Sequence, residues 1–265
     1  MRTATRVWGD VSADVHAARL RYFAETGAAE VRRAKGAFAV VTGAQSNIEN
    51  GIVGERDDVP AESAAELVAW IRDRDVPASW ICEAVPASDA LAETLGSLGC
   101  REETSGVDMG AELAEVREVG AEIDGLTLED VDSAGVLDAW LDVAQGCGWF
   151  TGGGDREGQR RLYTAAGFER DRPHRHWLAR RHGEAVGLAT AFFAAEIVLL
   201  ENLAVVPSER RRGIGTALTM LRLRKARRRG CRLAVLGPTA DSQPFYERLD
   251  FTVTGSPPRR WWYLP

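Results

Sequence analysis

Residues Glu201 to Phe251 carry the strongest structural signal in this chain; they read ENLAVVPSERRRGIGTALTMLRLRKARRRGCRLAVLGPTADSQPFYERLDF. The run Val198–Val205 is apolar and β-branched, which predicts a buried strand, and Pro207 ends it because proline cannot donate to a sheet. A glycine turn and a basic helix, Gly215–Arg229, follow. Such a turn at a helix N-terminus directs backbone N–H groups and the helix dipole at one spot, so it suits a phosphate.

The turn has the spacing R-x-x-G-x-G, formed by Arg210, Gly213 and Gly215. That spacing alone is equally compatible with an ordinary turn that places glycine at strained backbone positions. The segments that follow the turn help to decide between a phosphate-binding turn and an ordinary one. A second apolar strand, Arg232–Leu236, follows the basic helix, and Tyr246 comes just before another predicted strand. Strand, glycine turn, helix and strand in this order favour an anion cradle.

Three segments, taken in order, resemble motifs of the GNAT acetyltransferase family. The glycine turn resembles its coenzyme A motif, and QPFYERLDF resembles its Y-E-K-L-G-F signature, with Tyr246 in the tyrosine position and Asp250 replacing the usual glycine. Upstream, PHRHWLARRHGEAVGLATAFF is similar to the family's central hairpin, with His182 and Gly183 as the turn. The likeness covers roughly Leu126–Pro265, and the first half of the chain resembles the degenerate N-terminal domain of tandem GNAT proteins.

The resemblance implies an α/β (α+β) fold with two GNAT-like domains, each a mixed, mostly antiparallel sheet flanked by helices. Residues 1–115 would form a domain without a coenzyme A motif, and residues 120–265 the catalytic N-acetyltransferase domain. The acidic, helix-prone stretch Ala111–Gly120 is interpreted as the linker.

The two halves of the chain also match in pattern at a constant offset of 151 residues. Asn50–Gly54 then aligns with Glu201–Val205, and Trp80–Val85 with Cys231–Leu236. At this offset the glycine turn becomes Val59–Ala64, which contains no glycine, and Leu95 takes the place of Tyr246. The match predicts a duplicated fold of which only the second copy binds coenzyme A; chance similarity of two α/β units is the alternative.

The resemblance also implies a cofactor site. Acetyl-CoA would lie between splayed strands, with its pyrophosphate on the N–H groups of Arg211–Thr216 and its pantetheine arm on Leu203–Val205. The N–H of Val205 would polarise the thioester carbonyl, and a primary amine would attack without an acyl-enzyme. The implied cofactor-binding residues are Leu203, Ala204, Val205, Arg210, Arg211, Arg212, Gly213, Ile214, Gly215, Thr216 and Thr239.

Two residues are the candidates for proton transfer. Tyr246 holds the position of the family's general acid, which would protonate the departing thiolate; the alternative is a tyrosine that only packs on the cofactor. A lysine-like amine has a pKa of ~10.4 and must lose a proton before it attacks. Glu201 is the candidate base because it shares the strand of the acetyl site, or else it is a structural or substrate-orienting carboxylate. Glu196 is the reserve candidate.

Composition excludes several other classes of function. The net charge of −6 argues against a nucleic-acid-binding protein, and the run Arg222–Arg229 is interpreted as a solvated helix face. The four cysteines form no C-x-x-C pair, so we expect reduced thiols and no metal site. The N-terminus lacks the apolar core of a signal peptide and no apolar run approaches the ~20 residues that span a bilayer, so we expect a cytoplasmic protein without membrane contact.

The remaining predictions concern the acceptor. His174 and His176 have no metal spacing and are expected to be exposed or at the substrate's edge. The glycine-rich stretch Gly146–Gln159 is predicted to be a mobile loop, whose Trp149 and Phe150 could close over an acceptor. A second domain favours a small-molecule amine as partner, with the protein a monomer or homodimer. Two alternatives stay open: a non-catalytic coenzyme A-binding module, and an acyltransferase for a longer acyl-CoA.

Overall fold

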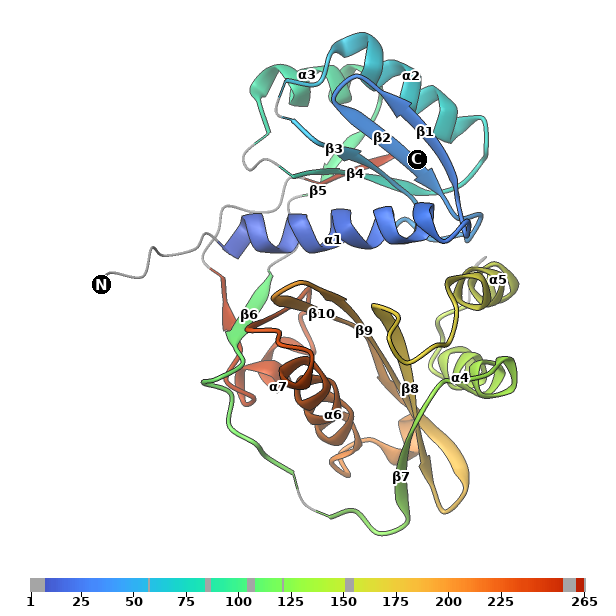
Figure 1. Ribbon diagram of the computed structural model, residues 1–265, viewed down its shortest axis with the longest axis vertical. Coiled ribbons are helices and arrows are strands. Elements are labelled where there is room, and N and C mark those ends of the chain that lie inside the picture. Colours follow the sequence, from blue (N-terminus) through green and yellow to red (C-terminus); the bar gives the residue numbers. More distant parts are fainter. Residues whose placement is uncertain are drawn as a thin grey trace. The chain divides into compact units, whose positions relative to one another are not determined.

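The computed structural model describes residues 8–56, 58–83, 87–103, 108–120, 122–150, 155–254 and 261–264. The chain forms two compact units, each built around one sheet (Figure 1). Unit 1 comprises Met1–Asp108 and Val253–Pro265, and unit 2 comprises Met109–Thr252. Both units combine a mixed sheet with helices, which confirms the predicted fold class. None of the helices in the described residues is long and apolar enough to cross a membrane.

Unit 1 holds a six-stranded sheet in the order β1-β2-β3-β4-β13-β5. Its neighbours are antiparallel except β3 and β4, which run parallel. Helix α1 covers one face, and α2 and α3 cover the other (Figure 1). The elements are α1 (Trp8–Glu25), β1 (Glu30–Ala34), β2 (Ala37–Val41), β3 (Gly51–Gly54), α2 (Ala61–Arg72), β4 (Ala78–Cys82), α3 (Asp89–Ser97), β5 (Arg101–Glu103) and β13 (Trp261–Leu264).

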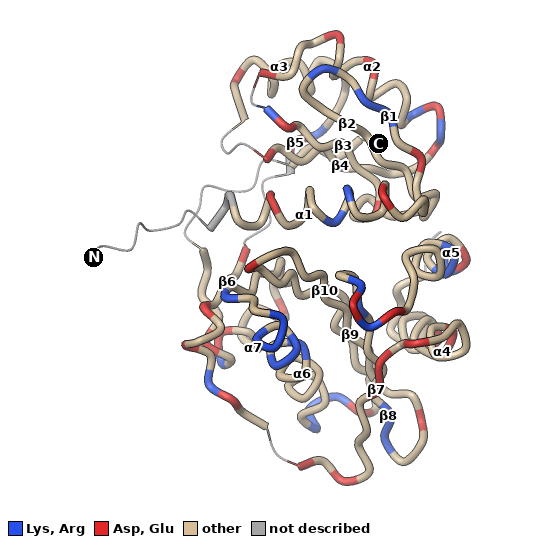
Figure 2. The backbone as a smooth tube through the Cα atoms, viewed as in Figure 1, with Lys and Arg blue, Asp and Glu red and all other residues tan. Residues whose placement is uncertain are grey.

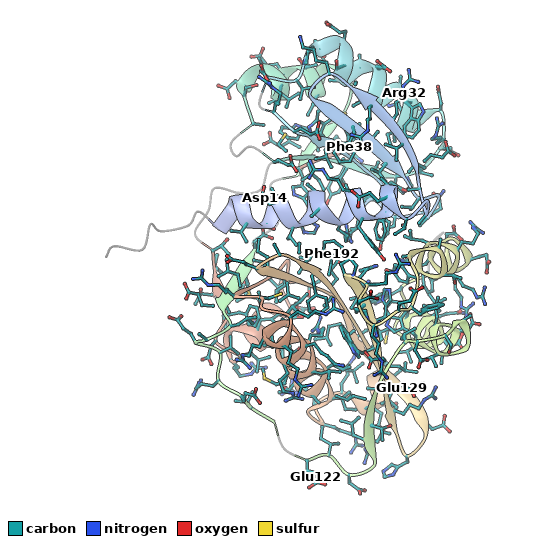
Figure 3. The ribbon with its side chains drawn as sticks, in the orientation of Figure 1. Asp14, Arg32, Phe38, Glu122, Glu129 and Phe192 are labelled. Atoms are coloured by element: carbon teal, nitrogen blue, oxygen red, sulfur yellow. The ribbon has the colours of Figure 1, made fainter. Side chains whose placement is uncertain are left out.

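The two faces of this sheet follow from the alternation of side chains along its strands. Ile52, Trp80 and Trp262 pack with α2 and α3 in one apolar cluster. Phe38 of β2 (Figure 3) is also buried. The guanidinium carbons of Arg21 and Arg33 lie 5.1 and 5.4 Å from the centroid of its ring. Unit 1 therefore has the buried apolar core of a stable domain.

Unit 2 holds a seven-stranded sheet in the order β12-β6-β11-β10-β9-β8-β7. Helices α4 and α5 cover one face, and α6 and α7 the other (Figure 1). The elements are β6 (Met109–Glu112), β7 (Leu126–Asp130), α4 (Ala134–Gly146), α5 (Arg156–Ala166), β8 (His174–Arg181), β9 (Glu184–Ala194), β10 (Ile197–Val205), η1 (Pro207–Glu209), α6 (Ile214–Arg228), β11 (Leu233–Leu236), α7 (Gln243–Glu247) and β12 (Thr252–Val253).

One ion-pair cluster joins β7, β8 and α6 in unit 2. Asp130 Oδ1 accepts from Arg175 Nη2 and Trp177 Nε1, both at 2.9 Å, and Asp130 Oδ2 lies 3.6 Å from Lys225 Nζ. Burial opposes ionisation of this carboxyl, but Lys225, Arg175 and Trp177 together hold its pKa below the ordinary value. Of the basic residues along α6 (blue in Figure 2), Lys225 thus forms an ion pair with β7.

The two sheets repeat one plan. In unit 1 the parallel pair β3–β4 stands between the hairpin β1–β2 and the strands β13 and β5; in unit 2 the parallel pair β10–β11 stands between the hairpin β8–β9 and the strands β6 and β12. The segments matched by the sequence offset fall on β3 and β10 and on β4 and β11. In both units, however, one strand of the sheet comes from the other half of the chain. Strand β13 lies between β4 and β5 in unit 1, and β6 lies between β11 and β12 in unit 2.

This exchange changes the predicted domain boundaries. Strand β6 pairs with β11 of unit 2, although the boundary at residue 115 assigns it to the first domain. Strand β13 pairs with β4 and β5 of unit 1, although residues 120–265 were expected to form one domain. The predicted helix-prone linker Ala111–Gly120 begins inside β6, where Ala111 is buried in the sheet, and residues 113–120 form no helix.

Other local predictions had mixed outcomes. The hairpin turn at His182 and Gly183 is confirmed, with φ of +51° and +90°. The loop predicted for residues 146–159 is shorter than expected, because α5 already begins at Arg156, where Asp155 Oδ1 accepts from Gly158 N at 2.7 Å as an N-cap. The predicted strand near Thr104–Met109 falls mostly on residues 104–107, outside the described residues.

Candidate functional site

The strand that leads into the glycine turn, β10, contains a bulge. Glu201 pairs with Thr190 of β9 and Ala204 with Leu188, so β10 has one more residue than β9 between these pairs. Asn202 takes a φ of +49° at this point. Because a bulge bends its strand and redirects the residues that follow, the segment Leu203–Val205 departs from the regular course of the sheet.

The edge of β10 that faces β11 is paired only at its start. Ile197, Val198 and Leu199 pair with β11, and among the described residues no register partner on β11 follows Leu199. Val206 N donates to Val186 O of β9 at 2.9 Å. Since peptide groups alternate in direction along a strand, the N–H of Val205 points away from β9, toward the open edge. Since β11 ends at Leu236, the edge of β10 beside Leu203, Ala204 and Val205 has no register partner on that strand within the described residues.

The loop after β10 presents backbone N–H groups at the start of α6. Gly213 is the N-cap of this helix, with a φ of +85°, and Arg211 has a φ of +63°. Across the described residues, none of the N–H groups from Arg211 to Thr216 donates to another backbone group. These groups lie at the positive end of the helix dipole. Arg211, Arg212, Gly213, Ile214, Gly215 and Thr216 thus present a run of backbone N–H donors at the start of α6.

Two arginines of this loop are engaged by protein groups. Arg210 Nε donates to Val205 O at 3.0 Å, and its side chain also interacts with Cys147, whose thiol pKa is raised by burial. Arg212 Nε lies 3.3 Å from Glu209 Oε2, which also accepts from Arg181 Nη1 at 2.9 Å. Arg210 and Arg212 are therefore each held by neighbouring protein groups.

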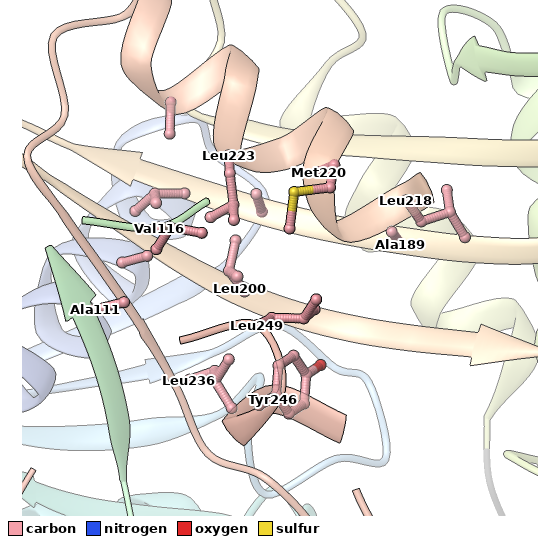
Figure 4. Packing of buried hydrophobic residues seen from close by; sticks show 14 of the residues in the cluster. Ala111, Val116, Ala189, Leu200, Leu218, Met220, Leu223, Leu236, Tyr246 and Leu249 are labelled. Carbon is pink, nitrogen blue, oxygen red and sulfur yellow. The ribbon is translucent and has the colours of Figure 1, made fainter. Parts of the chain in front are cut away.

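Tyr246 lies on α7, in the apolar cluster beneath the same site. Its ring is buried against Phe245 and Phe251, at centroid distances of 4.9 and 5.7 Å. Leu236 and Leu249 belong to the same cluster (Figure 4). Tyr246 also favours the charged form of the Arg222 guanidinium.

The prediction that Arg222–Arg229 forms a solvated helix face was wrong for Arg222, which is 0% exposed. Leu218, Arg222 and Ala226 are spaced by four residues and are all buried, so they share the inward face of α6. Burial lowers the pKa of the Arg222 guanidinium, while Tyr246 and Glu201 act in the opposite direction. Because Arg222 lies in a run rich in arginine, its position on the buried face of α6 was not recognised from the sequence.

Glu201 opposes Thr190 of β9, which in turn opposes His176 of β8, so the three residues form a row across the sheet. Glu201 Oε2 lies 3.8 Å from His174 Nε2, and His176 Nδ1 lies 2.8 Å from Thr190 Oγ1. Both histidines are buried, which corrects the expectation of exposed side chains. Burial, followed by the charges of His174 and Arg175, holds the pKa of His176 well below 6.5.

A hydroxyl that sequence analysis did not single out fixes α5 to the bulge. Tyr163 OH accepts from Gln159 Nε2 at 2.6 Å and from Asn202 Nδ2 at 3.1 Å. Nearby, the ring of Trp149 lies 5.8 Å from that of Trp140 and is 37% exposed. Phe150 is half-buried, and residues 151–154 of this loop lie outside the described residues.

Two further candidates lie apart from the bulge. Glu196 sits in the turn before β10 and pairs with Arg232 at 3.8 Å. At a strand rise of ~3.3 Å per residue it lies roughly 30 Å from Val205, so it is too distant to act as the reserve base. Thr239 is exposed in the turn before α7, where its hydroxyl lies 3.0 Å from Ser242 Oγ.

Comparison with known proteins identifies this arrangement. A family model described as the acetyltransferase (GNAT) family matches residues 140–251, which include the bulged strand, the glycine turn and Tyr246. Unit 2 of this chain thus contains a segment that matches the GNAT acetyltransferase family. No curated protein matches the sequence significantly.

Solved structures place both units in this family's fold. A GCN5-related N-acetyltransferase from Kribbella flavida matches with a TM-score of 0.66 at 18% identity, covering 95% of this chain and 93% of its own. A tandem GNAT protein from the clavulanic acid biosynthesis pathway matches with a TM-score of 0.55 at 16% identity, covering 98% and 96%. A GCN5-related N-acetyltransferase from Sphaerobacter thermophilus matches with a TM-score of 0.55 at 18% identity, covering 86% and 75%. The chain therefore has the tandem GNAT architecture.

The GNAT-like sheet of unit 1 lacks the unpaired strand edge found in unit 2. All four residues of β3 pair with β4, and Glu83 N donates to Gly54 O just beyond the last pair. The helix that corresponds to α6, α2, has Pro60 at its N-cap instead of glycine, and Leu95 is buried where unit 2 has Tyr246. The geometry of an unpaired strand edge beside a glycine turn is thus confined to unit 2 among the described residues.

Among the described residues, no three His, Cys, Asp or Glu side chains are grouped so that they could hold a metal ion.

Proposed function

We propose that unit 2 transfers an acetyl group from acetyl-CoA to a primary amine by direct attack. The observation that carries this proposal is the open edge of β10 at Val205, which adjoins the N–H groups at the start of α6. A thioester-linked pantetheine needs backbone partners of this kind, and its pyrophosphate needs a cluster of donors. The match to the GNAT acetyltransferase family supports the same substrate.

In this proposal three groups of the chain act on the reacting atoms. The N–H of Val205 donates to the thioester carbonyl, where negative charge develops as the amine attacks. Glu201, on the same strand, takes the proton of the attacking amine, directly or through water. Tyr246 donates a proton to the departing thiolate. The edge of β10, which among the described residues has no register partner on β11 beyond Leu199, supports this assignment because its backbone groups remain for a ligand.

The acceptor is tested by a thiol-release screen, in which acetyl-CoA is incubated with a panel of small amines and free thiol is measured. We expect release with at least one amine. Tyr246→Phe should lower kcat by about 10²-fold, the lower range for general acid catalysis, with little change in acetyl-CoA affinity because the ring still packs. Phe245→Leu, a change in the adjacent aromatic residue, serves as the packing control and should leave kcat within about threefold.

Other results of the screen would favour the alternatives. Tight acetyl-CoA binding without thiol release from any amine, unchanged by Tyr246→Phe, would favour a binding module in which the cofactor is sensed. Faster release with longer acyl chains would identify an acyltransferase of another chain length. Failure to bind any acyl-CoA would exclude the proposed function.

A further inference from the structure

The buried guanidinium of Arg222 lies at the meeting point of the elements that form the proposed acetyl-transfer site. It stands on the inward face of α6 at a position with 0% exposure. A fully buried arginine is rare because its charge is costly to remove from water unless its donors are satisfied. Its hydrogen-bond acceptors lie on β9, on β10 and on α6 itself.

The first partners are the two strands at the bulge. Arg222 Nη1 donates to Thr190 O at 3.1 Å and to Glu201 O at 3.0 Å. These carbonyls belong to the last regular pair before the extra residue of β10. A bulge disrupts the ladder of backbone hydrogen bonds locally, and the guanidinium supplies donors to both strands at that place. Arg222 therefore donates to both strands where the β10 bulge begins.

The second connection runs to the glycine turn. Arg222 Nη2 donates to Thr219 Oγ1 at 3.1 Å, and Thr219 Oγ1 donates to Gly215 O at 2.9 Å. Thr219 is itself 0% exposed. This chain of two hydrogen bonds links the bulge to the first turn of α6, which carries the N–H groups proposed to bind the pyrophosphate.

The third neighbour is Tyr246, which favours the charged form of the same guanidinium. The side chain of Glu201 also interacts electrostatically with the guanidinium.

We propose that Arg222 is a positioning residue of the transferase site, which holds the β10 bulge, the start of α6 and Tyr246 in fixed relation to one another. The inference rests on the proposed function for its catalytic consequence, but not for its effect on the bulge. Arg222 reaches the chemistry only through Glu201 O, Gly215 and Tyr246.

The test compares Arg222→Met, which keeps an unbranched apolar stem, with Arg222→Lys, which keeps the charge. Leu223→Ala is the matched control, since Leu223 is equally buried on the same helix and makes no side-chain hydrogen bond. Thr219→Val removes only the link to Gly215. Hydrogen–deuterium exchange is measured on peptides that cover residues 200–206 and 213–216, and acetyl-CoA binding is measured by calorimetry.

In Arg222→Met we expect exchange in residues 200–206 to accelerate at least tenfold and acetyl-CoA affinity to fall at least tenfold. Arg222→Lys should recover part of both losses, and Thr219→Val should mobilise only residues 213–216. Leu223→Ala should leave the exchange rate of residues 200–206 and the acetyl-CoA affinity within threefold of the wild type. If Arg222→Met and Leu223→Ala behave alike in both measurements, the arginine is an ordinary core residue and the proposal fails. If Arg222→Met does not fold, Arg222→Lys and Thr219→Val decide the question in the same way.

The exchange measurement is independent of the proposed function, because it needs no ligand. If the wild type does not bind acetyl-CoA, the proposed function fails while accelerated exchange in Arg222→Met still supports the role at the bulge. Once an acceptor is found, a double-mutant cycle with Tyr246→Phe separates positioning from general stability. Coupled residues give a loss in kcat for the double variant smaller than the product of the single losses. Fully multiplicative losses would overturn the link to Tyr246.

Discussion

At the scale of single residues, Gly213 is the position where backbone conformation and proposed function coincide. Its φ of +85° lies in the left-handed region, and an added Cβ would lie 3.2 Å from Ile123 Cδ1. Gly230, at the other end of α6, has a similar φ of +82° but meets nothing within 4 Å. The two glycines therefore have nearly the same backbone conformation but lie at opposite ends of α6.

This pair gives a controlled prediction. Gly213→Ala and Gly230→Ala should each destabilise the protein by about 1–2 kcal/mol, because both force a side chain into the left-handed region. Only Gly213→Ala should weaken acetyl-CoA binding, by about tenfold or more, since it tilts the N–H groups proposed to bind the pyrophosphate. Thermal denaturation and calorimetry of both variants check this. Equal acetyl-CoA affinity in the two variants would remove Gly213 from the site.

His176 makes the stability of unit 2 depend on pH. Its pKa in the folded protein is far below the unfolded value of ~6.5, so below about pH 6.5 the unfolded chain binds a proton that the folded chain rejects. The free energy of unfolding should then fall with decreasing pH by up to ~1.4 kcal/mol per pH unit from this residue, until the folded pKa is reached. Above about pH 7.5 the residue contributes no slope.

Denaturant unfolding from pH 8 to pH 5 measures this effect. His176→Gln, which can keep a hydrogen bond to Thr190, should reduce the acid slope by close to one proton. His182→Gln is the control, since that side chain is 55% exposed in the hairpin turn, and the slope should stay as in the wild type. An unchanged slope in His176→Gln would mean that the folded protein accepts a proton at His176.

At the scale of elements, the parallel strand pair distinguishes the two units. In unit 2, the described part of β10 beyond Leu199 has no register partner on β11, whereas β3 and β4 of unit 1 pair to the end of β3. A ligand that adds to an open strand edge forms hydrogen bonds with it, and a fully paired edge has none to offer. The difference predicts one cofactor site per chain.

Acetyl-CoA should accordingly bind with a stoichiometry of one, measured by calorimetry. Hydrogen–deuterium exchange should slow in residues 203–206 and 213–216 on binding, while residues 51–54 of β3 remain unchanged. Saturating coenzyme A without its acetyl group is the control, and it should protect the same segments. Protection of β3, or a stoichiometry of two, would contradict the assignment.

The elements around this site could be predicted from sequence because their signals are local. The apolar run of β10, the glycines after it and the spacing of α6 each determine a segment without reference to the rest of the chain. Strand β1 was not predicted, since its residues EVRRA are polar and almost wholly exposed. Arg222 was misread because burial of a charged residue depends on partners from β9 and β10 that no local pattern reveals.

At the scale of the whole molecule, the exchange of strands ties the two units together along the chain. Each sheet takes one of its strands from the part of the sequence that otherwise builds the other sheet. Short apolar segments such as β6 and β13 predict a strand but not its partner, which explains why sequence analysis placed the boundary after β6. A tandem duplication alone would have left each strand in its own half.

The exchange predicts which fragment of the chain folds. A fragment of residues 109–252 keeps the strands of the unit 2 sheet except for the last residue of β12, whereas a fragment of residues 120–265 lacks β6 and exposes the edge of β11. Loss of the buried Met109 side chain alone costs about 2 kcal/mol, and an uncovered strand edge promotes aggregation. The added β13, with buried Trp261 and Trp262, would lack its partners on β4 and β5.

We therefore expect the 109–252 fragment to be monodisperse, to unfold cooperatively and to bind acetyl-CoA with an affinity within about tenfold of the full chain. The 120–265 fragment should aggregate or unfold at a lower denaturant concentration. A fragment of residues 109–265 separates the two causes, because it restores β6 while keeping the unpaired β13. If 120–265 matches 109–252 in stability and binding, β6 is dispensable and the exchanged strand contributes nothing to the site; if 109–265 behaves like 120–265, the unpaired tryptophans of β13 cause the failure.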